Sequence, residues 1–138
     1  MSYLLDTNIV SELHKGERCN PAVAEWYRSI GDQETYTSVL VIGEIRKGIE
    51  QIRKRDAPRA DALEHWLNSV VTAFAERILL VDLQIAETWG QIRAIRSAPE
   101  IDALLAATAK VHGLTFVTRN TADVAGLGAD VLNPFSLR

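Results

Sequence analysis

The sequence contains a single cysteine, Cys19, among 138 residues. An intramolecular disulfide is therefore excluded, and so low a cysteine content is typical of a reducing compartment. No segment approaches the roughly 20 consecutive apolar residues that a transmembrane helix needs. The N-terminus lacks a charged region followed by a long apolar stretch, so we expect no secretory signal peptide. These absences predict a cytoplasmic protein that does not insert into a membrane.

Proline and glycine are also scarce, with 4 and 8 residues, and repeats and low-complexity segments are missing. Because no stretch has the composition of a linker, we expect one domain over residues 1–138. Hydrophobic residues make up 47% of the chain, which is enough for a sizeable core. The net charge of −3 argues against a protein that coats nucleic acid through bulk charge. It does not exclude a nuclease, in which local basic residues and local carboxylates nearly cancel.

Short apolar runs alternate with segments whose apolar residues recur at helical spacing. The expected strands are residues 3–5, 34–37, 78–81, 114–118 and 131–132. The expected helices are residues 9–14, 22–30, 60–74, 84–95 and 102–112, with another that begins at Ser38 and ends before Asp56-Ala57-Pro58. Strands that alternate with helices form a parallel sheet covered on both faces. In such α/β folds the ligand crevice lies at the carboxyl ends of the strands.

Four acidic residues fall near that edge. Asp6 and Asp123 each follow an expected strand, Asp102 begins a helix, and Glu44 lies six residues after Ser38. Each has an ordinary alternative, as a helix cap, a turn residue, a first-turn acid or a surface glutamate. Gathered at one edge without basic partners, however, carboxylates repel and raise one another's pKa values. A divalent cation such as Mg²⁺ or Mn²⁺ relieves that repulsion and activates water for attack at phosphorus.

Several segments, in this order and spacing, resemble the PIN-domain family and, within it, VapC-type toxins of bacterial toxin–antitoxin pairs. They are LLDTNIVSEL, VIGEIRKG, IDALLAATAKVHGLTFVTRNTADV and VLNPF, and the resemblance runs from Tyr3 to Phe135. It implies a three-layer α/β/α sandwich with a mostly parallel central sheet of about five strands. It also implies a metal-dependent endoribonuclease that forms homodimers and is inhibited by a VapB-type antitoxin. The antitoxin would make the hetero-oligomer's only DNA contacts.

The resemblance assigns Asp6, Glu44, Asp102 and Asp123 to the family's acidic positions. It implies that Asp6 and Asp102 bind Mg²⁺, or Mn²⁺, directly or through water. Glu44 would bind metal or act as the base toward the attacking water, and Asp123 would complete the cluster. Five polar neighbours are candidates to orient the acids or to contact RNA, with capping and turn formation as the alternative: Thr7, Asn8, Thr118, Arg119 and Asn120.

Three features depart from the family's pattern. Val124 stands where many relatives carry an aromatic residue, and Asn120 stands where some carry an acid. The connector RSAPE, residues 96–100, is shorter than usual. Basic residues follow Glu44, and we expect most of them to form a solvated helix face rather than to guide RNA phosphate: Arg46, Lys47, Arg53, Lys54, Arg55 and Arg59. The pair Glu50 and Lys54 has the spacing that supports this interpretation.

Other interpretations are weaker. A dehalogenase-type phosphatase needs a second acid two residues after the first, where this chain has Asn8. A receiver domain needs paired acids after the first strand and a lysine after a late strand, where this chain has Thr118 and Arg119. A PIN-like binding module without catalysis is expected to lose acids, yet all four remain. We therefore expect a ribonuclease, with such a module or another metal-dependent phosphohydrolase as alternatives.

Overall fold

The computed structural model describes residues 1–31 and 34–136. Within them, five strands form one sheet in the order β3–β2–β1–β4–β5, and every neighbouring pair is parallel. The strands are β1 Tyr3–Leu5, β2 Thr35–Ser38, β3 Ile78–Leu79, β4 Thr115–Val117 and β5 Asp130–Leu132. The expected parallel sheet is therefore confirmed.

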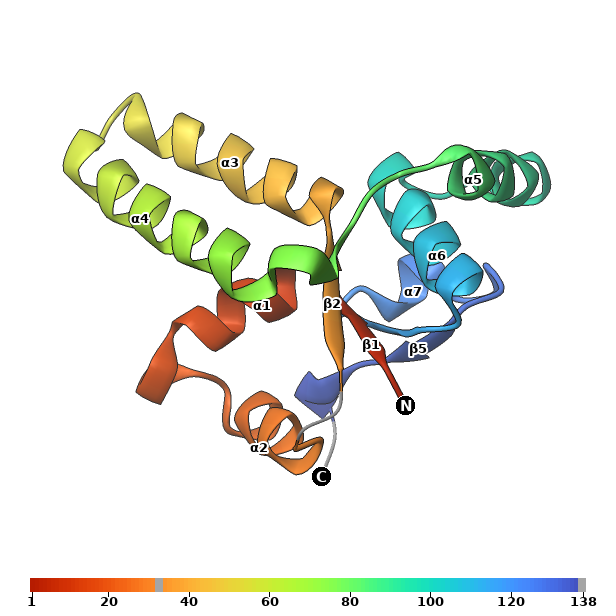
Figure 1. Cartoon of the computed structure of the whole chain (residues 1–138), viewed down its shortest axis with the longest axis horizontal. Helices are drawn as coiled ribbons and strands as arrows, with labels where there is room; N and C mark the ends of the chain where they lie inside the picture. The colour runs from red at the N-terminus through yellow and green to blue at the C-terminus, as the bar shows by residue number, and fades with distance from the viewer. Residues whose placement is uncertain (32–33, 137–138) are drawn as a thin grey trace.

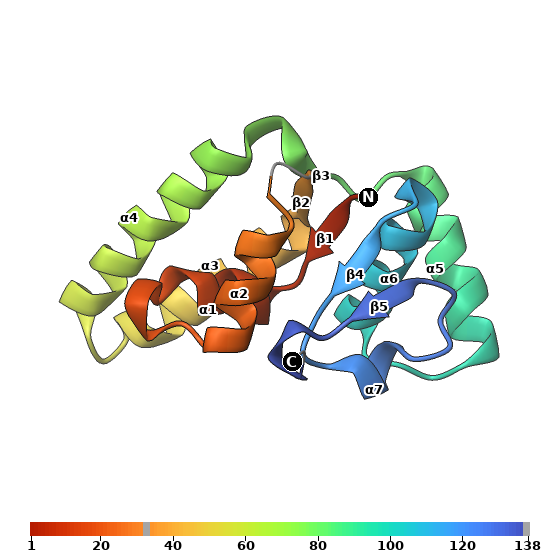
Figure 2. The same cartoon turned by 90° about the horizontal axis from the view of Figure 1, so that it is seen from below.

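Seven α-helices lie in the described residues. They are α1 Thr7–His14, α2 Pro21–Ser29, α3 Val39–Arg53, α4 Ala57–Phe74, α5 Leu83–Ile95, α6 Glu100–His112 and α7 Thr121–Val124. In both views, α1 to α4 lie on one side of the strands, while α5 and α6 lie on the other (Figures 1 and 2). This is the expected three-layer arrangement. None of the described helices is long and apolar enough to cross a membrane.

The direction of travel across the sheet reverses between β1 and β4. From β1 the chain moves outward to β2 and β3 through α1 to α4, and it returns through α5 and α6 to place β4 on the other side of β1. In such sheets, the helices that follow two neighbouring strands can lie on opposite faces, and a crevice then opens between them at the carboxyl ends of those strands. The register pairs Leu5 with Val117, so the next residues, Asp6 and Thr118, are neighbours in that crevice.

The helix boundaries follow local signals in the sequence. The Asn20 side chain accepts a hydrogen bond from the backbone of Ala22 at 2.9 Å, directly before Pro21. Gly113 ends α6 in the left-handed conformation, at φ +67°. Helix α4 begins three residues earlier than expected. Its first turn tolerates proline, and the Asp56 side chain caps it by accepting from the Arg59 backbone at 3.1 Å.

Two segments differ more from the expectation. The strand expected at residues 78–81 ends at Leu79, and the apolar side chains of Leu80 and Val81 are exposed instead of entering the sheet. Asp123, whose ordinary alternative was a loop or turn residue, lies in a short helix over residues 121–124. Four residues are too few to show helical periodicity, so the sequence carries no strong signal for it.

The core lies on both faces of the central strands. Leu4, Leu5, Phe116 and Val117 of β1 and β4 are fully buried, and helices from both sides pack against them. Because the side chains before Asp6 and Thr118 are locked in this core, the polar residues that follow start from a fixed position.

Gly113→Ala should lower the free energy of unfolding by about 1 kcal/mol, because an L-residue is disfavoured by roughly 1–2 kcal/mol in the left-handed region. Urea denaturation at neutral pH measures the change. Gly90→Ala in α5 is the matched control, since a Cβ there meets nothing within 4 Å. Its better helix propensity should raise stability by up to about 1 kcal/mol. Shifts of the same sign in both variants would contradict the prediction.

Candidate functional site

Asp6 is the most deeply buried of the four predicted acids, with 3% of its surface exposed. It occupies the N-cap position of α1, as the ordinary interpretation predicted, but capping uses only one oxygen. Oδ1 accepts from the Thr7 backbone at 2.7 Å, while Oδ2 accepts from the Thr118 hydroxyl at 2.7 Å. Burial raises the pKa of Asp6 despite both hydrogen bonds, and the charge of Glu44 raises it further. Burying the charged Asp6 carboxylate therefore costs more free energy than a solvent-exposed residue in the same capping position would.

Asn8 and Thr118 join the loops that follow β1 and β4. The Asn8 amide donates weakly to Asp6 Oδ2 at 3.4 Å, and its oxygen accepts from the Arg119 backbone at 3.2 Å. The fully buried Thr118 hydroxyl, which donates to Asp6, also accepts from the Asn120 backbone at 3.0 Å. These contacts hold the Asp6 carboxylate in one orientation.

Glu44 reaches the same place from α3. The Thr7 hydroxyl donates to Glu44 Oε1 at 2.7 Å, so residues 37 positions apart are in direct contact. The position of Glu44 is set by the neighbouring face of α3, where Val41, Ile45 and Ile49 are buried in the core. Glu44 itself is exposed, and one of its two oxygens remains free of hydrogen bonds within the described chain.

Asp102 lies in the first turn of α6 and is half-buried. Burial, together with the charges of Asp6, Asp123 and Glu44, raises the pKa of Asp102 to about 6. All three acids are thus close enough to act electrostatically on Asp102. The structure brings the four predicted acids into one cluster, defined here as the acidic cluster.

No lysine or arginine neutralises the acidic cluster through an ion pair in the described part of the chain. Within residues 1–31 and 34–136, no three His, Cys, Asp or Glu side chains converge tightly enough to enclose a metal ion. Mg²⁺ commonly keeps several waters and takes only one or two carboxylates from a protein. The oxygen donors therefore fit a hydrated Mg²⁺ or Mn²⁺ ion, but not a cage made wholly of protein ligands.

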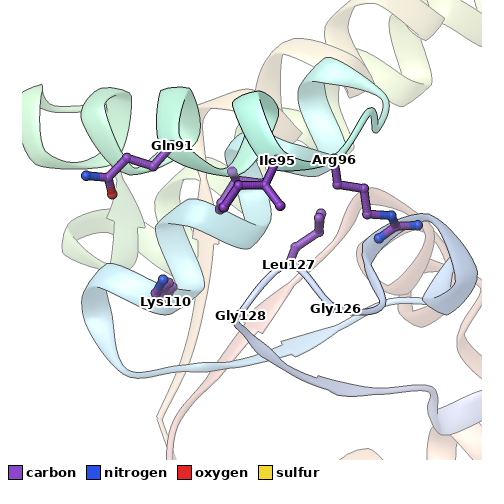
Figure 3. A pocket seen from close by; sticks show the side chains of 8 residues that line it. Gln91, Ile95, Arg96, Lys110, Gly126, Leu127 and Gly128 are labelled. Atoms are coloured by element: carbon purple, nitrogen blue, oxygen red, sulfur yellow. The ribbon is translucent and has the colours of Figure 1, made fainter.

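Asp123 is held at the acidic cluster by contacts that the sequence did not reveal. It is exposed in α7, whose Val124 side chain is fully buried in the core. Arg96, at the start of the short RSAPE connector, donates to the backbone oxygens of Ala122, at 3.1 Å, and Ala125. Figure 3 shows Arg96 extending toward this loop. Because the acceptors are backbone oxygens, which every residue carries, the amino-acid sequence does not indicate that Arg96 binds them.

Two hollows flank these elements. A groove of about 640 Å³ begins at Thr7 and Glu44 and follows α3, with Ile101 on its other wall. A pocket of about 450 Å³ lies between α5 and the loop after α7, lined among others by Ile95, Lys110 and Leu127 (Figure 3). The groove contains Glu44, and so does a smaller apolar pocket of about 230 Å³ lined among others by Ile49, Leu63 and Trp66. The pocket beside α5 contains no member of the acidic cluster.

The remaining predicted site residues have other contacts. The Arg119 guanidinium lies over the Phe135 ring, 4.5 Å from its centre. Asn120 precedes α7, but its side chain does not cap that helix. Arg46 and Arg53 form ion pairs with acids of α3 and α4, which agrees with the solvated-face interpretation for these two residues. The predicted partner of Glu50 was wrong, because Glu50 binds Arg46 and Arg53 instead of Lys54.

Comparisons with known proteins agree with this geometry. The family model described as PIN domain matches residues 3–125. The chain is 32% identical over 138 residues to Toxin FitB of Neisseria gonorrhoeae, covering 96% of this chain and 97% of that protein. It is 31% identical over 139 residues to VapC ribonuclease Y4jK of Sinorhizobium fredii, with 96% of both covered.

Solved structures give the same result. The crystal structure of FitAcB from Neisseria gonorrhoeae matches with a TM-score of 0.87 and 32% identity, covering 98% of this chain and 99% of that chain. A toxin-antitoxin complex from Klebsiella pneumoniae matches with a TM-score of 0.71 and 26% identity, with the same coverage. Five parallel strands and their flanking helices therefore form a PIN-like fold.

Asp102→Asn should raise the thermal midpoint of the metal-free protein at neutral pH. The folded state binds a proton at Asp102 more tightly than the unfolded state, so the wild type loses stability as pH rises from about 4 through about 6. Asparagine removes that loss. Thermal unfolding in EDTA should show a higher midpoint for the variant than for the wild type at neutral pH, and the two midpoints should become equal near pH 4. A midpoint at or below that of the wild type at neutral pH would contradict the predicted repulsion.

Proposed function

Because the chain belongs to the PIN domain family, we propose that it is a metal-dependent endoribonuclease and the VapC-type toxin of a toxin–antitoxin pair. The observation that carries the proposal is the acidic cluster, where unneutralised carboxylates raise the pKa of Asp102 to about 6. Such a cluster is unfavourable for stability and is expected where a cation is to be bound. The relatives named FitB toxin and VapC ribonuclease support the same activity.

Each acid has a role that its surroundings favour. Asp6, held by Thr7 and Thr118, presents its remaining lone pairs in a fixed direction, and with Asp102 it would hold Mg²⁺ or Mn²⁺ together with waters. A bound cation of this kind lowers the pKa of water and stabilises charge that develops at phosphorus. Asp123 would complete the negative charge of the site.

Glu44 is the proposed base. The Thr7 hydroxyl binds its Oε1 and thereby orients Oε2. That free oxygen would accept a proton from water as the water oxygen bonds to phosphorus and the bond to the leaving ribose oxygen breaks. The exposure of Glu44 at the start of the groove gives a strand access to it.

The partners follow from the relatives. FitAcB and the Klebsiella assembly are complexes, and another solved structure, with a TM-score of 0.87, holds FitAB bound to a DNA fragment. We infer that this chain binds a VapB-type antitoxin in a hetero-oligomer that contacts DNA through the antitoxin. Pairing with a second copy of the chain, and a cytoplasmic location, stay predictions.

The purified chain, freed of antitoxin, should cleave total cellular RNA in Mg²⁺ or Mn²⁺ and stop when EDTA is added. Asp6→Asn should lower the rate by at least about 100-fold, because it removes a proposed ligand. Thr118→Val, which removes only the orienting hydroxyl, should cost about 10–100-fold. Labelled RNA on denaturing gels measures all three rates.

Asp130→Asn is the matched control, because Asp130 is exposed and pairs with Thr115 at the opposite edge of the sheet. It should cut like the wild type. Cleavage that continues in EDTA, or an Asp6→Asn variant as active as Asp130→Asn, would refute the metal-dependent mechanism.

Expression without antitoxin should arrest growth, and Asp102→Asn should not. Co-expression of the neighbouring antitoxin gene should restore growth, while the Asp130→Asn control should arrest it as the wild type does. Optical density and colony counts after induction provide the measurement. Equal arrest by the wild type and Asp102→Asn would separate toxicity from the acidic cluster.

A further inference from the structure

We propose that one face of α3 binds the sugar–phosphate backbone of the RNA on one side of the cleavage point. This face, called the α3 strip, consists of Gly43, Lys47, Gly48, Gln51, Lys54 and Arg55, and it begins beside Glu44. The proposal rests on the proposed function and adds to it the path that the substrate follows away from the acids.

The strip follows from helix geometry. With 3.6 residues per turn, positions 3, 4 and 7 after Glu44, which are Lys47, Gly48 and Gln51, lie on its side of the helix. Helix α3 ends at Arg53, and Lys54 follows it with helical backbone angles. Arg55 lies in the turn after the helix, where its backbone donates to Ile52 at 3.0 Å, so the last two residues of the strip extend it past the helix end. At a rise of 1.5 Å per residue, Lys47 lies about 5 Å along the axis from Glu44, and Gln51 about 10 Å.

The structure separates the basic residues of α3 into two groups. Arg46 lies 3.0 Å from Glu64, and Arg53 lies 2.6 Å from Asp61, so both face α4 and are neutralised by it. Lys47, Lys54 and Arg55 are exposed, and none forms an ion pair in the part of the chain that the structure describes. The cations left for an external anion are therefore those on the strip.

Gly43 and Gly48 support close approach from outside. Each lies inside a 15-residue helix, where glycine costs roughly 0.5–1 kcal/mol relative to alanine. A Cβ at either position meets nothing within 4 Å, so no contact with the described chain requires a glycine there. Both residues line the groove of about 640 Å³, together with Lys47 and Gln51. Because these two glycines carry no side chains, the sugar–phosphate backbone of an RNA strand in the groove could come close to the helix.

RNA is the occupant that the charges favour. A strand cut internally must cross the acidic cluster and continue beyond it, and the groove begins at Thr7 and Glu44. Phosphates that approach four carboxylates are repelled, and a row of free cations beside the cluster offsets that repulsion. A peptide would instead need apolar anchors. Such anchors line a separate pocket of about 230 Å³ that also touches Glu44 and Gly48, among them Ile49, Leu63 and Trp66. Along the groove itself, beyond its opening at Val39, Leu40 and Ile101, the strip offers only glycine, amide and cationic groups.

The first test measures RNA binding without cleavage. Lys47, Lys54 and Arg55 are replaced together by alanine, and a fluorescein-labelled single-stranded RNA of mixed sequence is titrated in EDTA at several salt concentrations. Each lost phosphate contact should reduce the slope of log affinity against log salt by about 0.7, or about 2 for three contacts. The matched control replaces Arg18, Arg28 and Lys110 by alanine. These three are exposed, and none forms an ion pair in the described chain.

The control should leave the slope close to that of the wild type. An equal reduction in both triple variants would overturn the proposal, because binding would then follow net charge alone. The proposal also fails if the strip variant keeps its RNA affinity but loses binding to the antitoxin encoded by the adjacent gene.

A second variant tests the groove. Gly48→Gln introduces a good helix former where a Cβ has room, so stability should be retained or raised. Its side chain should obstruct the strand and raise KM for RNA cleavage with little change in kcat, the pattern of lost ground-state binding. Gly90→Gln in α5 should leave both constants unchanged. Unchanged KM in Gly48→Gln would refute the groove as the path.

The two levels of the proposal fail separately. If the wild type cleaves RNA with Mg²⁺ but the strip variant has an unchanged salt slope, the strip is wrong and the ribonuclease stands. If neither the wild type nor Asp130→Asn cleaves RNA with any divalent cation, the ribonuclease is wrong, whatever the slope shows, and the strip cannot be a path to its acids.

Discussion

The hydrogen bond between Thr118 and Asp6, 2.7 Å long, is the contact on which the rest of the site depends. It joins the ends of β1 and β4, which are adjacent only because the chain crosses back over the sheet between β3 and β4. The buried residues before it, Leu5 and Val117, fix the register. From this point the contacts spread outward. Thr7 binds Glu44, and Asn8 ties down the backbone after Thr118.

The acidic residues of this chain occur in two contrasting arrangements, one with arginine partners and one without them. In the hairpin of α3 and α4, Glu50, Asp61 and Glu64 each bind arginine, an arrangement that stabilises the hairpin modestly and fixes its geometry. At the carboxyl edge of the sheet, acids are brought together without such partners, and burial with mutual repulsion raises the pKa of Asp102 to about 6. Arginines were available nearby in the sequence, so their absence from the cluster is a property of the fold. That contrast distinguishes a binding site from a structural ion-pair network.

Much of this could be predicted from the sequence, because the signals are local or periodic. Asn20 before Pro21 and Gly113 after a regular helix define boundaries through backbone chemistry that acts within a few residues. Asp6, Asp102 and Asp123 could be placed at one edge because they follow strands or begin a helix, and Glu44 could be placed near it because it lies six residues after Ser38. The role of Arg96 could not be predicted, since it binds backbone oxygens of a helix too short to show periodicity. The ion-pair partners of Arg46 and Arg53 could not be predicted either. Their long side chains reach acids of α3 and of α4, and the acids of α4 come within reach only when the two helices pack together.

Helix α3 combines three tasks on three faces, and this division explains how the exposed Glu44 side chain, the proposed base, can be held rigidly. Val41, Ile45 and Ile49 fasten one face to the core, while Arg46 and Arg53 fasten a second to α4. Glu44 and the α3 strip occupy the third face, where Glu44 binds Thr7 and none of the strip's cations forms an ion pair in the described chain. We expect substitutions along the strip to change how tightly RNA is bound without moving Glu44, because the helix beneath it is fixed from the other two sides. Because the core and α4 hold the helix, the position of the Glu44 carboxylate does not depend on which side chains stand on the strip.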